Sequence, residues 1–475
     1  MLQPPENLAS ENASFGLARQ REEEYLDIAT NDNAASVKLA FSHRAGLWDP
    51  WPLLAHLDVE PPHLRYAALP RNPTDPLILN FQVVGALIGG LMTSGMFYRL
   101  LGAMLLCIST LAYSETADFQ PKFPRTMSWS AYNLGTTGYN QAVGIGKALK
   151  DHYNVNLRIL PGKNDVSRLL PLQRGRVQFS ANGVATYFAQ EGVFQFAGKT
   201  WGPMQLRLVI ASHGDSNQAL GVANDLGIKT YADLRGKRVP YVRGAPALNV
   251  TTEAFLACGG LTWDDVERVD FPGYNAMWTG IVNDQVDAAY ATTVSGPTRK
   301  LEASPRGIFW PPAPHDDDGC WQRMDKVVPF MQKHVATRGA AISEAQPHEG
   351  ATYPYPMLIT LAKQDDQVVH DLAKAIHIHY DDYKNADPGS IGWAMDRQNF
   401  QWVVPFHAGA IRYFKSIGVW SEAADAHNAR LIERQDVLAQ AWQDHKTQDH
   451  DDFANAWLIR RAAALEQAGF DPIWR

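Results

Sequence analysis

A glycine- and threonine-rich turn is the stretch whose residue types are best suited to bind a ligand. Gly135-Thr136-Thr137-Gly138 follows a short strand-like segment and precedes apolar residues at helical spacing. Glycine permits backbone angles closed to other residues, so the chain can come close to a ligand. The hydroxyls stand beside a predicted helix N-terminus, where unpaired N–H groups and the helix dipole favour an anion. The turn indicates a carboxylate or phosphate site; an ordinary strand-to-helix turn is the alternative.

Other patterns that could support chemistry are weak. Gly144-Ile145-Gly146-Lys147 lacks the spacing of a phosphate-binding loop. His377 and Asp381 stand four residues apart on a predicted helix, but His379 points elsewhere, which favours a solvated helix face over a metal site. No Ser-His-Asp or Cys-His signature occurs in a recognisable local context. We therefore expect no catalytic residues, no metal and no cofactor.

Length and charge narrow the class of protein. A chain of 475 residues is too long for one compact core, so two or more domains are expected. The formal net charge of −7 gives no sign of the basic surface that nucleic-acid binding requires. We expect no nucleic-acid partner.

The three cysteines leave the redox state open. Cys107, Cys258 and Cys320 form no CxxC pair, which excludes zinc-ribbon and thioredoxin-like sites. Cys107 lies in an apolar run near the front of the chain. Cys258 and Cys320 could form a disulfide in an oxidising compartment. The alternative, which we favour from the residues alone, is two independent thiols.

The front of the chain differs in composition from the rest. Residues 1–91 contain proline clusters and polar runs with no sustained period, which predicts disorder or a segment added by a wrong start site. Residues 92–114 resemble a secretory signal peptide, with Arg99, an apolar run and small residues at the Ala112-Tyr113-Ser114 cleavage site. A membrane anchor over residues 77–111 is the alternative, because that stretch exceeds the ~20 residues of a spanning helix. Both interpretations place the remainder outside the cytoplasm, in the periplasm.

Downstream, short strands alternate with helices, which implies a parallel sheet covered on both faces. In such sheets ligands bind at the carboxyl ends of the strands, where Thr136, Thr137 and Asn182 would lie. A second strand–loop–helix opening, Gly244 to Thr252, repeats the layout of the first. Two such units predict two similar lobes that face one cleft.

The lobes are expected to exchange segments. We place lobe one at residues 125–223 with 355–445, and lobe two at residues 224–354. A strand over Met357–Leu361 would return the chain to lobe one. Further helices are predicted over residues 366–385, 390–399, 407–417 and 421–445, and residues 446–475 would form a C-terminal helical tail.

Several of these segments, in this order, resemble the TAXI-type solute receptors of TRAP transporters. The matching stretches include Leu134-Gly135-Thr136-Thr137-Gly138-Tyr139, Asp233-Leu234-Arg235-Gly236-Lys237-Arg238-Val239 and Pro405-Phe406-His407-Ala408-Gly409-Ala410-Ile411-Arg412-Tyr413-Phe414. The resemblance implies an α/β, two-lobed periplasmic binding protein of type II with a ligand cleft between the lobes, here with extra C-terminal helices. Such a receptor captures a small organic anion and delivers it to ion-gradient-driven TRAP membrane permease subunits. Similar family members are associated with glutamate, glutamine and related carboxylates.

We expect the ligand, an amino acid such as glutamate or a dicarboxylate, to lie between the lobes. Most candidate residues stand at the end of a predicted strand or the start of the next helix. From lobe one they are Tyr132, Asn133, Thr136, Thr137 and Asn182. From lobe two they are Arg243, Ala245, Asn249, Val250, Trp278 and Thr292. The alternatives to a transport receptor are an enzyme on the same fold and a membrane-tethered sensory receptor.

Overall fold

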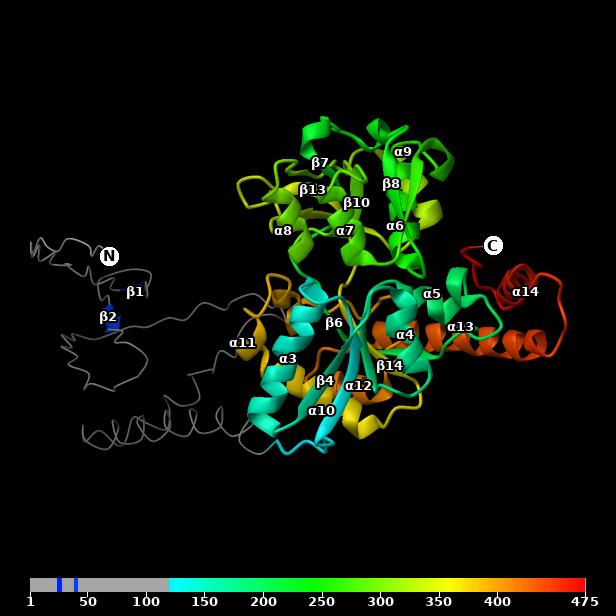
Figure 1. The fold of residues 1–475 in the computed structure, drawn as a ribbon. Coiled ribbons are helices and arrows are strands. Elements are labelled where there is room, and N and C mark those ends of the chain that lie inside the picture. The colour runs from blue at the N-terminus through cyan, green and yellow to red at the C-terminus, as the bar shows by residue number, and fades with distance from the viewer. Residues whose placement is uncertain (1–23, 28–37, 42–118, 475) are drawn as a thin grey trace, which may run out of the picture. The chain divides into compact units, whose positions relative to one another are not determined.

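The computed structural model describes residues 24–27, 38–41 and 119–474 (Figure 1). The chain divides into two compact units, residues 1–94 and 95–475. In the first unit, β1 (Glu24–Asp27) and β2 (Lys38–Phe41) pair as an antiparallel ribbon, within a segment whose composition predicts little structure. The predicted signal peptide and the alternative membrane anchor lie outside the described residues. Among the residues that are described, no helix has the length and apolar character needed to cross a membrane.

Lobe one, in the second unit, is built on a five-stranded sheet with helices packed against it. The strand order is β4-β3-β5-β14-β6; β3 pairs in parallel with β4 and β5, and β14 lies antiparallel between β5 and β6. The strands are β3 (Thr126–Ala131), β4 (Asn156–Pro161), β5 (Phe179–Asn182), β6 (Leu206–Ala211) and β14 (Met357–Leu361). The helices are α3 (Thr137–Tyr153), α4 (Asp165–Gln173), α5 (Ala185–Glu191), α10 (Asp366–Ile378), α11 (Tyr380–Tyr383) and α12 (Ala408–Ser416). The return strand predicted over Met357–Leu361 is confirmed.

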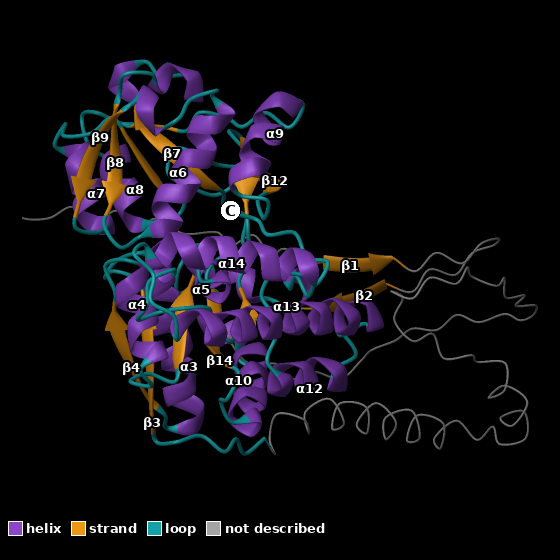
Figure 2. Cartoon of the chain, turned by 90° about the vertical axis from the view of Figure 1, so that its right-hand side faces the viewer, coloured by secondary structure: helices purple, strands orange, loops and turns teal. Residues whose placement is uncertain are grey.

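Lobe two has a second sheet, in the order β10-β7-β13-β12 with β11 also paired to β7. It also has a parallel pair, β8–β9, whose strands lie side by side in Figure 2. The strands are β7 (Gln218–Ala223), β8 (Arg238–Val242), β9 (Glu267–Phe271), β10 (Ala288–Thr292), β11 (Ile308–Phe309), β12 (Gln332–Ala336) and β13 (His348–Thr352). The helices are α6 (Pro246–Cys258), α7 (Tyr274–Val282), α8 (Gly296–Glu302) and α9 (Asp318–Val327).

Three details of the predicted organisation are wrong. The sheets are not simply parallel as expected, because β14 runs antiparallel to its neighbours in lobe one and the larger sheet of lobe two is paired antiparallel. The strand Gln218–Ala223, placed in lobe one, pairs antiparallel with β10 along its length and belongs to lobe two. The chain crosses between the lobes just before it, where Ser212 and the Tyr355-Pro356 segment exchange backbone hydrogen bonds of 2.6 and 2.8 Å. The helix predicted over residues 390–399 consists of two short 3₁₀ turns, Ser390–Trp393 and Met395–Arg397.

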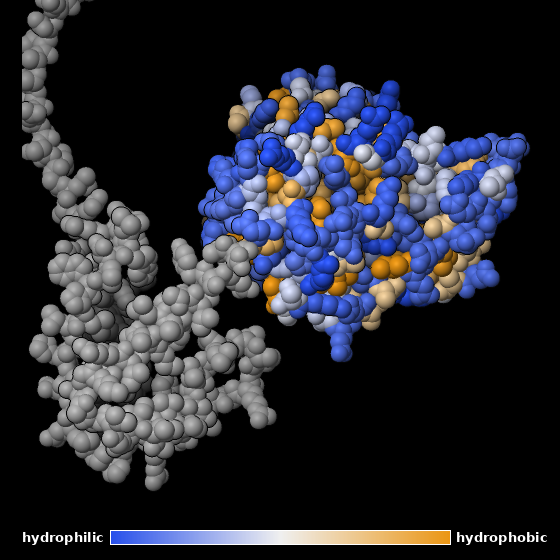
Figure 3. Space-filling model, turned by 90° about the horizontal axis from the view of Figure 1, so that it is seen from below, coloured by the Kyte–Doolittle hydropathy of each residue, from blue (hydrophilic) through white to orange (hydrophobic). Residues whose placement is uncertain are grey.

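The C-terminal residues form two further helices, α13 (Glu422–Lys446) and α14 (Phe453–Gln467), which pack against each other (Figure 2). Trp442 and Trp457 meet edge to face between them, with ring centroids 4.9 Å apart. Seen from below, lobe one and these helices present a mostly hydrophilic surface with scattered hydrophobic residues (Figure 3). Trp457 also donates to Gly192 O, just after α5, at 2.7 Å, so the two helices extend lobe one.

A disulfide joins Cys258, the last residue of α6, to Cys320 in the first turn of α9. Our interpretation of these residues as two independent thiols is wrong. The two helices pack side by side and bring together residues 62 positions apart in the sequence.

Candidate functional site

A small cavity lies between the lobes, at the carboxyl ends of β3, β5 and β10. Its volume of about 40 Å³ is small beside the ~300–1,000 Å³ of typical ligand pockets. An occupant must therefore be small, or the lobes must part to admit it. The lining residues are Tyr132, Asn133, Thr136, Lys163, Asn164, Asp165, Arg168 and Gly183, with Gln218, Ala247, Leu248, Tyr274, Tyr290, Ala291, Thr292, Tyr353 and Tyr355.

The lobes meet directly around this cavity. Gly296 of lobe two approaches the carbonyl oxygen of Gly135 in lobe one so closely that a Cβ atom on Gly296 would overlap it. Hydrogen bonds between described residues also cross the cleft. They include Val166 N to Gly244 O (3.2 Å), Tyr274 N to Lys163 O (3.1 Å), Asn164 Nδ2 to Arg243 O (2.9 Å), Ala247 N to Asp165 Oδ2 (2.8 Å) and Asn275 Nδ2 to Leu134 O (3.3 Å). The structure is that of a closed cleft.

A buried ion pair forms the charged floor of the cavity. Asn164 caps α4, because its side chain accepts a 2.9 Å hydrogen bond from Ser167 N. Asp165 and Arg168 then stand three residues apart on the first turn and face the same way. They form an ion pair although only 1% and 5% of their surface is exposed. Arg168 Nε also donates to Asn182 Oδ1 at 3.1 Å.

Arg168 keeps one edge free for a ligand. Its Nε and Nη2 atoms are used by Asn182 and Asp165, whereas no hydrogen bond joins its Nη1 atom to another described residue. Planar guanidinium groups bind carboxylates through two parallel N–H donors. The arrangement can therefore anchor a carboxylate from the cavity.

The Asp165 carboxylate also contacts the N-terminus of a lobe-two helix, a position that suits an anion. Its second oxygen accepts from Ala247 N, in the first turn of α6. The chain's own carboxylate thus caps the lobe-two helix across the closed cleft. Burial raises the pKa of Asp165 above its ordinary value, while Arg168 and the Ala247 N–H oppose that rise.

Five tyrosines form the walls: Tyr132, Tyr274, Tyr290, Tyr353 and Tyr355. The Arg168 guanidinium lies 4.0 Å from the ring centroid of Tyr132, within cation–π range. The rings of Tyr132 and Tyr355 are 5.2 Å apart. Burial raises the pKa of all five hydroxyls, so they remain neutral hydrogen-bonding groups at physiological pH.

Four of the predicted residues line the cavity: Tyr132, Asn133, Thr136 and Thr292. The Thr136 hydroxyl is engaged, because it donates to Asn133 O at 2.7 Å. The side-chain oxygen of Asn133 is buried and has no hydrogen-bond partner among the described residues. Because unsatisfied buried acceptors are rare in folded proteins, this oxygen is a natural contact for a donor on the ligand.

Two predicted residues lie directly behind the cavity wall. The hydroxyl of Thr137 donates to Asp387 and also accepts from Gln141 Nε2 at 2.9 Å, so it fixes α3 to a neighbouring loop. Asn182 orients Arg168 from behind.

The other predicted residues, all from lobe two, do not line the cavity. Asn249 bonds to both the N–H and the C=O of Val242, and so holds α6 against β8. Arg243 points outward, with 74% of its side chain exposed, and pairs with Asp270 at 3.2 Å. The remaining three, Ala245, Val250 and Trp278, are buried in the protein interior.

The charged floor and four of the five tyrosines were not among the predicted site residues. No motif in the sequence distinguishes Asp165 or Arg168 from ordinary residues at a helix start. Tyr353 and Tyr355 lie in the Tyr-Pro-Tyr-Pro segment where the chain crosses between lobes, and that position was the one signal available. Tyr274 and Tyr290 have no distinguishing local pattern.

The solved structures that resemble the chain include two sulfonate-binding proteins. The periplasmic aliphatic sulphonate-binding protein SsuA from Escherichia coli shares 14% identity, covering 73% of this chain and 89% of its own, with a TM-score of 0.35. The alkanesulfonate-binding SsuA from Xanthomonas axonopodis pv. citri, bound to MOPS, shares 14% identity over 70% and 98% of the two chains, with a TM-score of 0.36. R. palustris Rpa4515 with adipate shares 14% over 67% and 99%, with a TM-score of 0.42. No curated protein matches the sequence.

A family profile described as the NMT1-like family matches residues 133–418, which is more than half of the chain and includes both lobes and the cavity. The two α/β lobes around a closed cleft, with added C-terminal helices, form the type II periplasmic-binding-protein fold. This family is related to the TAXI receptors of TRAP transporters, and its members are generally non-catalytic binding proteins. The chain therefore belongs to the NMT1-like family and is a solute-binding protein of a transporter.

Proposed function

We propose that the cleft captures a small α-amino acid, such as glutamate, outside the cytoplasm and delivers it to a TRAP-type permease. The observation that carries this proposal is the buried Arg168 beside the cavity, whose Nη1 atom has no hydrogen-bond partner among the described residues. A charged donor that is fixed by Asp165 and Asn182 is prepared for a carboxylate before the ligand arrives.

Acceptors beside Arg168 favour an ammonium group on the same ligand. The unpaired side-chain oxygen of Asn133 and the carboxylate of Asp165 both border the cavity. Each carboxylate oxygen has two lone pairs, so Asp165 can accept from a ligand while it holds Arg168 and Ala247. The Tyr355 ring in the cavity wall would stabilise a cation further. A donor and acceptors in one small cavity match the zwitterionic head of an amino acid.

A dicarboxylate is the second candidate, and Lys163 is the observation that favours it. Lys163 lines the same cavity from lobe one and could meet a second carboxylate. Glutamate would use both arrangements, with its α-carboxylate at Arg168 and its side chain near Lys163. Succinate would lack the ammonium group that Asn133 and Asp165 are placed to accept.

Delivery to a permease and export rest on different support. The resemblance to TAXI receptors over the two lobes supports a TRAP-type partner. The Cys258–Cys320 disulfide suits an oxidising compartment, in agreement with the predicted signal peptide.

Calorimetry on two arginine variants tests the proposal. Glutamate, glutamine and succinate would first be compared by thermal shift, because a ligand that binds only the folded state raises its stability. For the best ligand, Arg168→Gln should weaken affinity about tenfold to a hundredfold, as expected for a lost charge-assisted hydrogen bond. Arg243→Gln, whose side chain points away from the cavity, should leave affinity unchanged. Unchanged affinity in folded Arg168→Gln, or chemical conversion of the recovered ligand, would contradict the proposal.

A further inference from the structure

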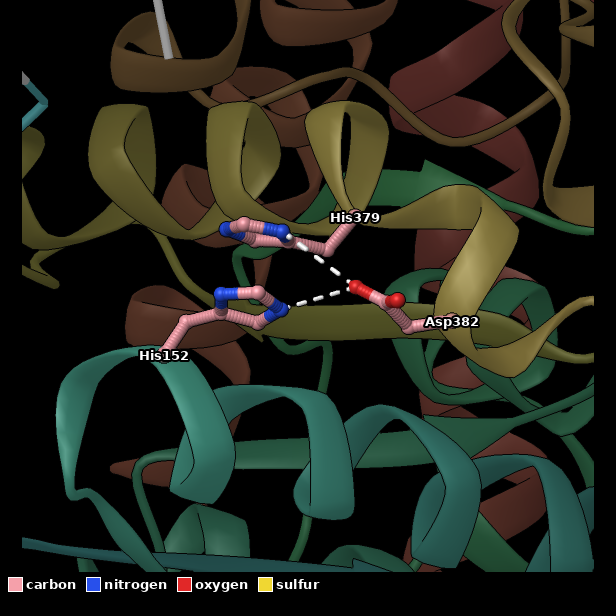
Figure 4. A group of neighbouring side chains, drawn as sticks. All are labelled: His152, His379 and Asp382. Atoms are coloured by element: carbon pink, nitrogen blue, oxygen red, sulfur yellow. Dashed lines mark hydrogen bonds and ion pairs between the residues drawn. The ribbon is translucent and has the colours of Figure 1, made fainter. Parts of the chain in front are cut away.

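Lobe one carries a second group of ligand-type side chains, at the opposite end of α3 from the cleft. His152 Nε2 lies 2.8 Å from Asp382 Oδ2, and His379 Nδ1 lies 3.4 Å from the same oxygen. One ligand atom from each of the three residues falls within 4.8 Å of the other two. Figure 4 shows both imidazole rings presenting a nitrogen to the Asp382 carboxylate.

The fold brings these residues together independently of their own contacts. His152 lies in the last turn of α3, His379 lies between α10 and α11, and Asp382 lies in α11. Along the same face of α3, Gly144 approaches Ala386 so closely that a Cβ atom would lie 2.6 Å from the Ala386 Cβ. Nearer the cleft, Asn140 Nδ2 donates to Asp387 at 3.1 Å. The three side chains therefore stand on a rigid, packed framework.

A hydroxyl behind the group can orient one ring. The other nitrogen of His379, Nε2, lies 2.7 Å from the Tyr153 hydroxyl. Histidines that bind metals usually have such a partner on the second nitrogen, which fixes the tautomer. The Tyr153 hydroxyl can either donate or accept a hydrogen bond. Tyr153 can therefore hydrogen-bond to His379 Nε2 both in the absence of a metal and when Nδ1 gives its lone pair to a cation.

The two imidazole rings also contact each other directly. The rings of His152 and His379 are stacked, with centroids 3.6 Å apart and planes 15° from parallel. Each stacked ring still directs one nitrogen at Asp382 Oδ2, so an ion bound beside that oxygen would lie near both rings.

We propose that His152, His379 and Asp382 form a binding site for a divalent transition-metal ion of the Zn²⁺ type. Two imidazoles and one carboxylate are ligands that Zn²⁺ accepts, at about 2.0–2.2 Å, with water in the remaining position. Tetrahedral ligand atoms at that range stand about 3.3 Å apart, close to the 2.8 and 3.4 Å separations seen from Asp382. Binding requires the stacked rings to splay, which His152 can do because 40% of its side chain is exposed.

An ion bound at this site would link the C-terminal end of α3 to the segment that joins α10 and α11. The sequence could not indicate it, because His152 is 230 residues from Asp382. His377, which we had considered beside His379, instead lies 2.6 Å from the Tyr413 hydroxyl.

Titration of the full-length protein, without a histidine tag and after treatment with EDTA, tests this site. Zn²⁺ is the calorimetric probe, and Co²⁺ absorption reports the coordination geometry. The wild type should bind one Zn²⁺, and His152→Ala and His379→Ala should each weaken binding at least tenfold. Tyr153→Phe should weaken it about 10–100-fold, as for other outer partners of metal ligands. His377→Ala, two residues from His379, is the matched control and should bind as the wild type does.

Asp382→Asn provides a milder variant should an alanine variant fail to fold, as judged by circular dichroism. It keeps the side chain's size and should also weaken Zn²⁺ binding at least tenfold. Absence of Zn²⁺ binding by the wild type would overturn the proposal. So would binding that survives in His152→Ala, or binding that falls equally in His377→Ala.

Discussion

Replacing Glu191 with Gln should detach the C-terminal helices from lobe one. Glu191, at the end of α5, is fully buried between Arg434 of α13 and Arg461 of α14. Arg434 donates to both of its oxygens, at 2.7 and 2.8 Å, and Arg461 forms a further ion pair with it. A Gln side chain has the same shape, but its amide would place N–H donors against N–H donors.

The expected loss is about 3–5 kcal/mol, the usual cost of removing one partner from a buried ion pair. Arg461 has no exposed surface, so water cannot replace the lost carboxylate. The loss is large against a typical total stability of about 5–15 kcal/mol. The midpoint of urea unfolding should therefore fall clearly, or a separate early transition should appear as α13 and α14 come loose.

The loss of stability in Glu191→Gln should be smaller in acid than at neutral pH. Burial alone would raise the pKa of Glu191, but Arg434 and Arg461 outweigh it and hold the pKa below its ordinary value. Because the folded-state pKa is the lower one, the carboxylate stabilises the protein above its unfolded pKa of about 4.5. That contribution disappears as the pH falls through the folded-state pKa, so wild type and Glu191→Gln should converge in acid.

Urea unfolding of three proteins at pH 7 and at pH 3–4 is the assay. Glu433→Gln, which removes an exposed pair with Arg430 on the same helix, is the control and should change stability by less than about 0.5 kcal/mol. A loss below about 1 kcal/mol in Glu191→Gln at pH 7, or a difference from wild type that grows in acid, would refute the reasoning.

Three further outcomes are expected. The Cys258→Ser, Cys320→Ser double variant should lose about 4 kcal/mol in urea unfolding, because the disulfide closes a loop of 62 residues; equal stability would mean that the bond does not form in the protein. Trp474→Ala should lower stability by about 2 kcal/mol, less than the ~3–5 kcal/mol of a fully buried Trp. The indole packs on Phe188 of lobe one and donates to Val327 O of lobe two at 2.9 Å. An unchanged melting temperature would show that this contact is absent in solution. Thr137→Val should lower the melting temperature and leave ligand affinity within about twofold, because the Thr137 hydroxyl bonds to Asp387 behind the cavity. A tenfold loss of affinity without destabilisation would support the prediction from sequence that Thr137 binds the ligand.

The elements of lobe one could be predicted because their signals are local. Apolar periodicity and the Gly135 turn locate β3 and α3, and the run Met357–Leu361 identifies the return strand. Pairing between distant strands has no local signal. Gln218–Ala223 is apolar enough for either lobe, and only its pairing with β10 assigns it to lobe two.

The site was predicted by position better than by residue. Strand ends led to Tyr132, Asn133, Thr136 and Thr292, all of which line the cavity. Arg168 escaped notice because an arginine on the first turn of a helix normally faces solvent. Its burial depends on Asp165, and on a lobe-two helix that begins about 80 residues later. Asn249 misled us, since an Asn near a helix start serves backbone geometry as readily as a ligand.

A crystal structure with the amino acid that gives the largest thermal shift would test the central claim most directly. We predict ligand density in the cavity between the lobes, with its carboxylate within hydrogen-bond distance of the Arg168 guanidinium and its ammonium group facing Asn133 and Asp165. Density for the ligand elsewhere on the protein, with this cavity empty, would contradict the assignment of the cleft and of Arg168 as its anchor.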